Sequence, residues 1–141
     1  MSVRYQFLSQ TKKNFGFLEA LGYQIKCEYE GTHVSFKDGF HISYASSDLT
    51  ARIAYYDMEL EIVFMKGKIS APYLFLDMNL FSNASGLSGI MFAHDKLAPV
   101  IEDAAKDIQA NYKLILTGDI TVWRKIEKLV SAPTEKKAFL P

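Results

Sequence analysis

The chemistry available to this chain depends first on its three histidines, His33, His41 and His94. Histidine is the commonest metal ligand and titrates near neutral pH. The strand register expected from the sequence places His33 and His41 diagonally on the outward face of neighbouring strands, with Glu28 opposite His33. Two imidazoles and one carboxylate resemble a metal triad in composition. The stronger interpretation is a solvated sheet face, which carries outward His and Glu side chains of this kind, and we therefore expect no metal.

The other candidate motifs also have structural explanations. His94 and Asp95 precede an expected helix and are suited to cap it. The pair Gly118-Asp119 is explained by the end of one helix and the start of the next. The sequence has no G-x-S-x-G, no glycine-rich phosphate loop, no C-x-x-C and no H-E-x-x-H. We therefore predict that the protein is not an enzyme and uses no cofactor.

An alternation of apolar and polar residues over 23–65 predicts the scaffold that would position these side chains. Short loops that contain glycine are typical of hairpins. The expected sheet is therefore an antiparallel meander, in which Val34 pairs with Ile42 and Ile53 pairs with Leu60. Its five expected strands are residues 23–29, 32–36, 40–44, 49–55 and 58–64.

Three helices are expected beside this sheet. The first covers residues 1–21 and ends before Gly22, although Asn14 and Gly16 also allow two helical pieces. The second runs from about Lys96 to Leu116, with a proline in its first turn, where a missing N–H costs least. The third follows the cap at Asp119.

The predicted fold class is α+β, with an N-terminal helix, a five-stranded antiparallel meander, and C-terminal helices packed on one sheet face. Residues 1–130 are expected to form a single domain, and residues 131–141, which include two prolines, a flexible C-terminal tail. A lone cysteine, Cys27, at an inward strand position favours a reducing compartment. No signal peptide or long apolar run is evident, so we expect a cytoplasmic protein.

The charge balance bears on the partners. Sixteen basic and sixteen acidic residues cancel, without a block of Lys or Arg. A general nucleic-acid binder, or a binder of anionic membranes, carries a basic surface. We therefore expect neither nucleic acid nor a membrane as a partner.

Residues 69–93 contain a single charged residue, Asp77, among many apolar ones. One interpretation is a connector partly buried under the helices, with a short helix that Asp77 starts. The other is an apolar surface for a partner, since large exposed apolar patches are unusual on monomers. Such a surface would suit a homodimer. Its expected contact residues are Tyr73, Phe75, Phe81, Leu87 and Phe92.

The order of these elements resembles that of small bacterial proteins encoded beside polymorphic toxins and described as immunity proteins. The most specific piece of the resemblance is the stretch from Tyr112 to Trp123, with its apolar helix end, the Gly118-Asp119 break and the following aromatic residue. The resemblance implies a protein that neutralises a toxin by surface complementarity. Such proteins share no catalytic motif, so no functional residue is carried over from them.

The function expected from these observations is stoichiometric, non-enzymatic binding of a protein partner such as a toxin. The outward sheet face, where Arg52 is expected opposite Glu61, would make the contact through Glu28, His33, His41, Arg52 and Glu61. The alternative is a small apolar ligand held in an aromatic cavity between the sheet and the helices. The residues expected to line that cavity are Tyr23, Tyr29, Phe36, Phe40 and Tyr44.

Overall fold

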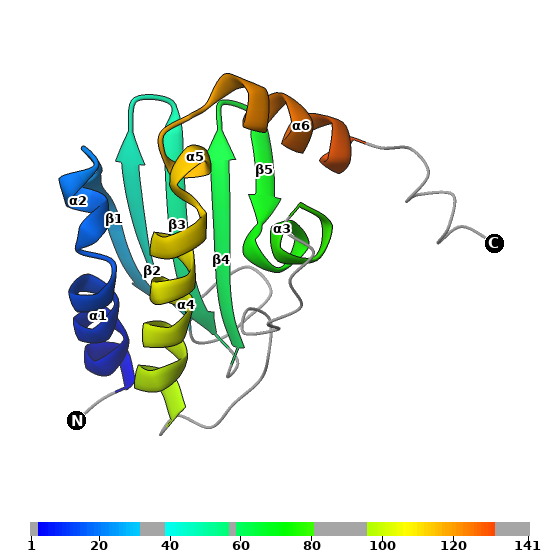
Figure 1. The fold of residues 1–141 in the computed structure, drawn as a ribbon. Helices are drawn as coiled ribbons and strands as arrows, with labels where there is room; N and C mark the ends of the chain where they lie inside the picture. The colour runs from blue at the N-terminus through cyan, green and yellow to red at the C-terminus, as the bar shows by residue number, and fades with distance from the viewer. Residues whose placement is uncertain (1–2, 32–38, 57–58, 81–95, 132–141) are drawn as a thin grey trace.

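The structure is a computed structural model of the 141-residue chain (Figure 1). It describes residues 3–31, 39–56, 59–80 and 96–131, and of these it describes the backbone alone at 27–31 and 56. The predicted C-terminal tail and the pair His94-Asp95 lie almost wholly outside these residues.

The N-terminal helix is divided where the sequence allowed a division. Helix α1 (Val3–Asn14) buries Phe7 and Thr11, and the four-residue α2 (Phe17–Ala20) buries Leu18. The chain then leaves the helix at Gly22, whose φ of 97° suits a residue without a Cβ. The prediction of a helix that ends before Gly22 is therefore confirmed.

Five antiparallel strands form one sheet in the order β1-β2-β3-β4-β5, so every strand pairs with its neighbour in the sequence. The predicted α+β class, with a five-stranded antiparallel sheet between N- and C-terminal helices, is confirmed (Figure 1). The strands are β1 (Gln24–Gly31), β2 (Gly39–Ser46), β3 (Leu49–Tyr56), β4 (Glu59–Lys66) and β5 (Ile69–Pro72).

The identity of the strands differs from the prediction in two places. Ile42 of β2 lies between Glu28 of β1 and Ile53 of β3, so the predicted pairing of Ile42 with Val34 is wrong. The predicted strand 32–36 lies outside the described residues. The fifth strand is instead β5, in the segment that was expected to be a connector.

The register of the remaining strands is displaced from the prediction by two residues. Ile53 pairs with Ile62 and not with Leu60. In the β3–β4 hairpin Tyr56 pairs with Glu59. The β2–β3 hairpin is displaced in the same way, because Ser46 pairs with Leu49 and the loop is only two residues long. Ser47 closes that loop with a φ of 57°. Because a shift of two residues preserves the face on which each side chain lies, the predicted inward row is still buried.

A β-bulge in β1 changes the pairing of its second half. The register shifts between Ile25, which lies opposite Tyr44, and Cys27, which lies opposite Ser43. Glu28 consequently lies opposite Ile42, and the prediction that places it in an outward row opposite His33 is wrong. A bulge inserts one unpaired residue, so the alternation of the strand is displaced by one position after it.

Helix α3 (Tyr73–Asn79) follows β5 directly. It begins after Pro72, so the predicted helix start at Asp77 is wrong. The predicted long helix is divided at Tyr112 into α4 (Leu97–Asn111) and α5 (Lys113–Leu116). Gly118, with a φ of 77°, then ends α5, and Asp119 caps α6 (Ile120–Val130) by accepting a hydrogen bond of 3.0 Å from the Val122 N–H.

The core lies between the sheet and the helices on one of its faces. Helices α1 and α4 pack against each other across that face (Figure 1). The fully buried side chains include Ile42, Ile53, Leu60 and Ile62 from the sheet and Ile101 and Ile108 from α4. The helices cover this face alone in the described part of the chain, and the opposite face, which we call the outer face, carries none of them.

Candidate functional site

The outer face is built from the alternate residues of β2, β3 and β4 that point away from α1 and α4. Directly opposite residues in these strands form rows, because side chains of paired residues lie on the same face. The rows are His41, Ala54 and Glu61; Ser43, Arg52 and Val63; and Ala45, Thr50 and Met65.

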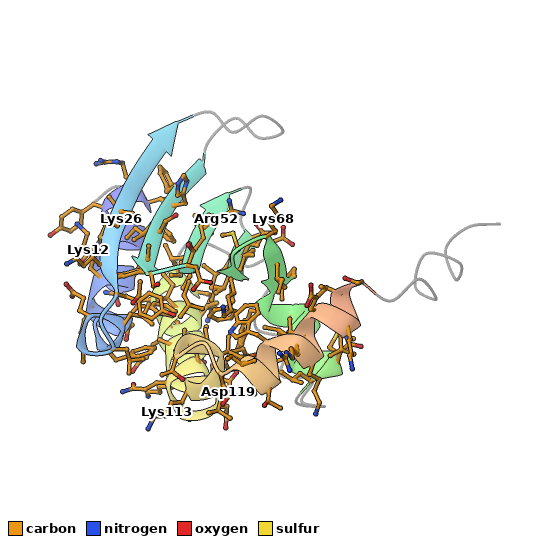
Figure 2. All side chains as sticks on the ribbon, turned by 90° about the horizontal axis from the view of Figure 1, so that it is seen from above. Lys12, Lys26, Arg52, Lys68, Lys113 and Asp119 are labelled. Atoms are coloured by element: carbon orange, nitrogen blue, oxygen red, sulfur yellow. The ribbon has the colours of Figure 1, made fainter. Side chains whose placement is uncertain are left out.

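Arg52 is the long cationic side chain at the centre of these rows. It is half-buried and lies opposite Ser43 on one side and Val63 on the other, so the predicted direct pairing with Glu61 is wrong. Within the described residues, its guanidinium takes part in no ion pair. Figure 2 shows Arg52 and Lys68 in its upper part, while Lys113 of α5 lies at the bottom.

Small side chains surround Arg52 on the outer face. Ala54 and Val63 are each only 6 % exposed. Ser43 and Thr50 are half-buried in the neighbouring rows. Side chains of this size leave the centre of the face nearly flat, so that a partner could approach the strands closely around one projecting guanidinium.

The structure brings together three of the five predicted partner-binding residues. His41, Arg52 and Glu61 all lie on the outer face, on three neighbouring strands, and each is half-buried. Glu28 belongs to a different row, and His33 lies outside the described residues. The role of these residues in binding stays a prediction.

The predicted self-association surface is only partly described. Tyr73 is fully buried, and Phe75 is half-buried against the core. Phe81, Leu87 and Phe92 lie outside the described residues. In this conformation Tyr73 therefore serves the interior of the protein and offers no surface to a second copy.

A buried polar network joins α3 to α4. The Tyr112 hydroxyl donates a hydrogen bond of 2.7 Å to Oδ1 of Asp77, a residue only 2 % exposed. The Tyr73 hydroxyl donates to the Asp107 carboxylate, which also accepts a hydrogen bond of 2.7 Å from the Asn111 amide. Burial and the Asp77 carboxylate raise the pKa of Tyr112. Since Asp77 is closed to solvent, we assign the network a structural role.

Sequence reasoning missed this network. Asp77 is the only charge in an apolar segment, and that isolation was a signal of a buried, partnered carboxylate. Its partner could not be inferred, because Tyr112 lies 35 positions away and reaches it only after α3 folds back against α4.

Two aromatic side chains hold the end of α5. The Tyr23 hydroxyl donates a hydrogen bond of 2.6 Å to the Leu116 carbonyl, and the Trp123 indole N–H donates one of 2.9 Å to the Ile115 carbonyl. Both acceptors are terminal helix carbonyls that lack a partner inside the helix. Burial, followed by the charge of Asp48, raises the pKa of Tyr23 to about 12.

The residues expected to line an aromatic ligand cavity pack against the helices instead. Tyr23 and Tyr44 are 3 % and 1 % exposed and belong to the core. The Phe40 ring stacks on Phe7 of α1, with centroids 6.2 Å apart. Tyr29 and Phe36 lack described side chains. The described members of the set therefore fill the interior themselves.

The raised pKa of Tyr23 predicts an alkaline loss of stability. The unfolded chain releases this proton near the ordinary pKa of about 10, whereas the folded protein retains it up to about 12. Between these values the unfolded state binds fewer protons, so the free energy of unfolding falls as the pH rises. We expect Tyr23→Phe to flatten this dependence in urea unfolding measured across that range. Equal slopes for both proteins would contradict the assignment.

The fold defines an α+β protein whose antiparallel sheet is covered by helices on one face. No family model matches the chain, and neither a curated protein nor a solved structure matches it. Among the described residues, no three His, Cys, Asp or Glu side chains gather in a group that could hold a metal ion. None of the helices in the described ranges is both long and apolar enough to cross a membrane.

Proposed function

We propose that the protein is a non-enzymatic binding protein that contacts a protein partner stoichiometrically through its outer face. The observation that carries this proposal is Arg52, a half-buried residue whose guanidinium forms no ion pair among the described residues, on the sheet face that no described helix covers. Arginine is enriched among the few residues that dominate binding free energy at interfaces.

The size of the outer face is adequate for such a contact. Strands β1 to β4 each contain eight residues. With a rise of roughly 3.3 Å per residue and roughly 4.8 Å between strands, they present on the order of 500 Å² in projection. Accessible area exceeds projected area, and a stable complex buries about 800 Å² on each partner. The face therefore supplies most of one side of an ordinary interface.

The charges on the face favour selectivity. A carboxylate of the partner can pair with the planar guanidinium of Arg52 through two hydrogen bonds. Glu61, diagonal to Arg52 across the strands, would repel a partner whose acidic group is displaced toward β4. The partner surface is therefore expected to be acidic opposite Arg52 and basic or neutral opposite Glu61.

The particular form of binding that we propose is neutralisation of a bacterial toxin. It is supported by the resemblance of the element order, and of the Tyr112–Trp123 stretch, to immunity proteins. If the reading frame beside this one encodes a toxin, its expression alone should stop growth, and co-expression of this protein should restore it. Restored growth with Arg52→Glu at equal expression would contradict a role for the outer face.

Arg52→Glu should reduce capture of the partner more than tenfold, because it places a negative charge where an acidic group is expected. The matched control is Lys113→Glu, which makes the same change on an exposed residue of α5. Tagged proteins are cross-linked in cells of the source organism, and captured proteins are quantified by mass spectrometry. Thermal midpoints of both variants should stay near that of the native protein. A captured set that is equal for native protein and Arg52→Glu would exclude the outer face.

A further inference from the structure

A cavity of about 230 Å³ lies where helices α3, α4, α5 and α6 meet, away from the outer face. Its apolar wall consists of Leu80, Leu114, Ile115 and Val122. Leu114 is 54 % exposed, which is high for a leucine on a helix that packs into the domain. Figure 2 labels Lys113 and Asp119, which mark the start of α5 and the cap of α6 beside this cavity.

The polar lining of the cavity is confined to three residues. Asn111, Thr121 and Lys125 contribute an amide, a hydroxyl and an ammonium group. Lys125 is the only charged residue among the described lining residues, and it forms no ion pair within the described part of the chain. Nearby Asp107 already accepts hydrogen bonds from Asn111 and Tyr73. The cavity thus combines an apolar wall with one cation.

We propose that this cavity binds a small amphipathic carboxylate. The volume equals that of about eight waters in the liquid, so the apolar body of the ligand is a short chain or a single ring. Its carboxylate would pair with the Lys125 ammonium and its apolar body would cover Leu114, removing exposed apolar surface from water. A pocket with an apolar wall and a few polar groups at one side has the general form of small-molecule sites.

A monovalent carboxylate fits the charge of the site better than a phosphate. Phosphate sites combine several donors, such as arginine or lysine side chains together with the free N–H groups of a helix N-terminus. The N-terminus of α6 is already capped, because the Val122 N–H donates to Asp119 at 3.0 Å. The Asp119 carboxylate also makes the N-terminus of α6 unfavourable for an anion. The Lys125 ammonium is then the one positive group of the described lining, and it can balance one negative charge on a ligand.

Octanoate is a suitable probe, with octanol and octylamine as ligands of matched length. We expect octanoate to bind the native protein at a molar ratio of one, octanol to bind at least tenfold more weakly, and octylamine not to bind. Lys125→Met should weaken octanoate binding about tenfold and leave octanol binding unchanged. Lys128→Met, the same substitution one turn further along α6, is the matched control and should bind octanoate as the native protein does.

Filling the cavity provides a second test that does not depend on charge. Thr121 lines the cavity but is exposed, so Thr121→Trp should fold normally while occupying the space. Titration calorimetry should then show loss of octanoate binding, and NMR shifts in the native protein should be confined to Leu80 at the end of α3, the end of α4, α5 and the first half of α6. Equal affinity for octanoate and octanol, retention of binding in Thr121→Trp, or shifts elsewhere would overturn the proposal.

The proposal for this cavity and the proposal for the outer face can be tested separately. Arg52→Glu should bind octanoate normally, because Arg52 lies on the far side of the sheet from α4. Lys125→Met should in turn capture the protein partner normally. A variant that loses both activities would indicate a damaged fold, which the thermal midpoint would show.

Discussion

Replacing Ile53 by alanine lowers the free energy of unfolding by about 2 to 5 kcal/mol, the range for deleting a large aliphatic side chain from a core. Ile53 is fully buried and lies between Ile42 and Ile62 on the two neighbouring strands. The central strand is held on both sides by hydrogen bonds, so the cavity left by the missing carbons cannot collapse easily. Urea unfolding monitored by circular dichroism provides the measurement.

The matched control for this prediction is Arg52→Ala, one position earlier on the same strand. Arg52 points to the outer face, so its removal should change stability far less. If both substitutions lower the midpoint equally, the inward and outward rows of β3 have been assigned to the wrong faces.

Tyr112→Phe is expected to lower the free energy of unfolding by about 1 to 3 kcal/mol, because it removes a hydrogen bond to a buried, charged acceptor. The acceptor is Oδ1 of Asp77, which receives the Tyr112 hydroxyl at 2.7 Å and is shielded from water. The ring is retained, so its contact with Phe64, at 5.2 Å between centroids, should survive. The loss therefore measures the hydroxyl alone.

A double-mutant cycle with Asp77→Leu isolates the coupling between the two side chains. Once one partner of the hydrogen bond is removed, removing the other no longer costs that bond, so the double variant should lose less stability than the sum of the two single losses. Strict additivity, within about 0.5 kcal/mol, would mean that the Tyr112–Asp77 hydrogen bond does not stabilise the packing of α3 on α4.

The sequence could predict which face of each strand is buried, but not the partner of each residue. Alternation determines a side chain's face, and a slip of two residues leaves every face unchanged. Pairing Ile53 with Leu60 or with Ile62 therefore produces the same apolar row. The observed register follows from the β3–β4 hairpin, in which Tyr56 pairs with Glu59. The β2–β3 hairpin is displaced by two residues as well, because Ser46 pairs with Leu49 across a two-residue loop in which Ser47 adopts a positive φ. Serine is not among the residues that signal this conformation, so the loop was expected to be longer.

The same reasoning explains what could be predicted of the candidate sites. The expected alternation places His41, Arg52 and Glu61 on the same face, and a slip of two residues does not change this, even though the expected pairing of Arg52 with Glu61 is wrong. The position of Glu28 was predicted wrongly because the bulge after Ile25 shifts the alternation by one residue. No glycine or proline at that point of the sequence signals the bulge. The cavity beside Lys125 depends on the convergence of four helices, which no local pattern encodes.

The sequential strand order also determines when the inner sheet face is protected during synthesis. Each hairpin closes a short loop and can form as soon as its two strands are available, so the sheet needs few distant contacts. Helix α4, which covers that face, is synthesised after all five strands. Until then, Ile53 and Ile62 lack this cover, and the growing chain presents an apolar sheet surface that a chaperone could bind. Synthesis of the C-terminal helices thus ends the period in which this apolar face is exposed.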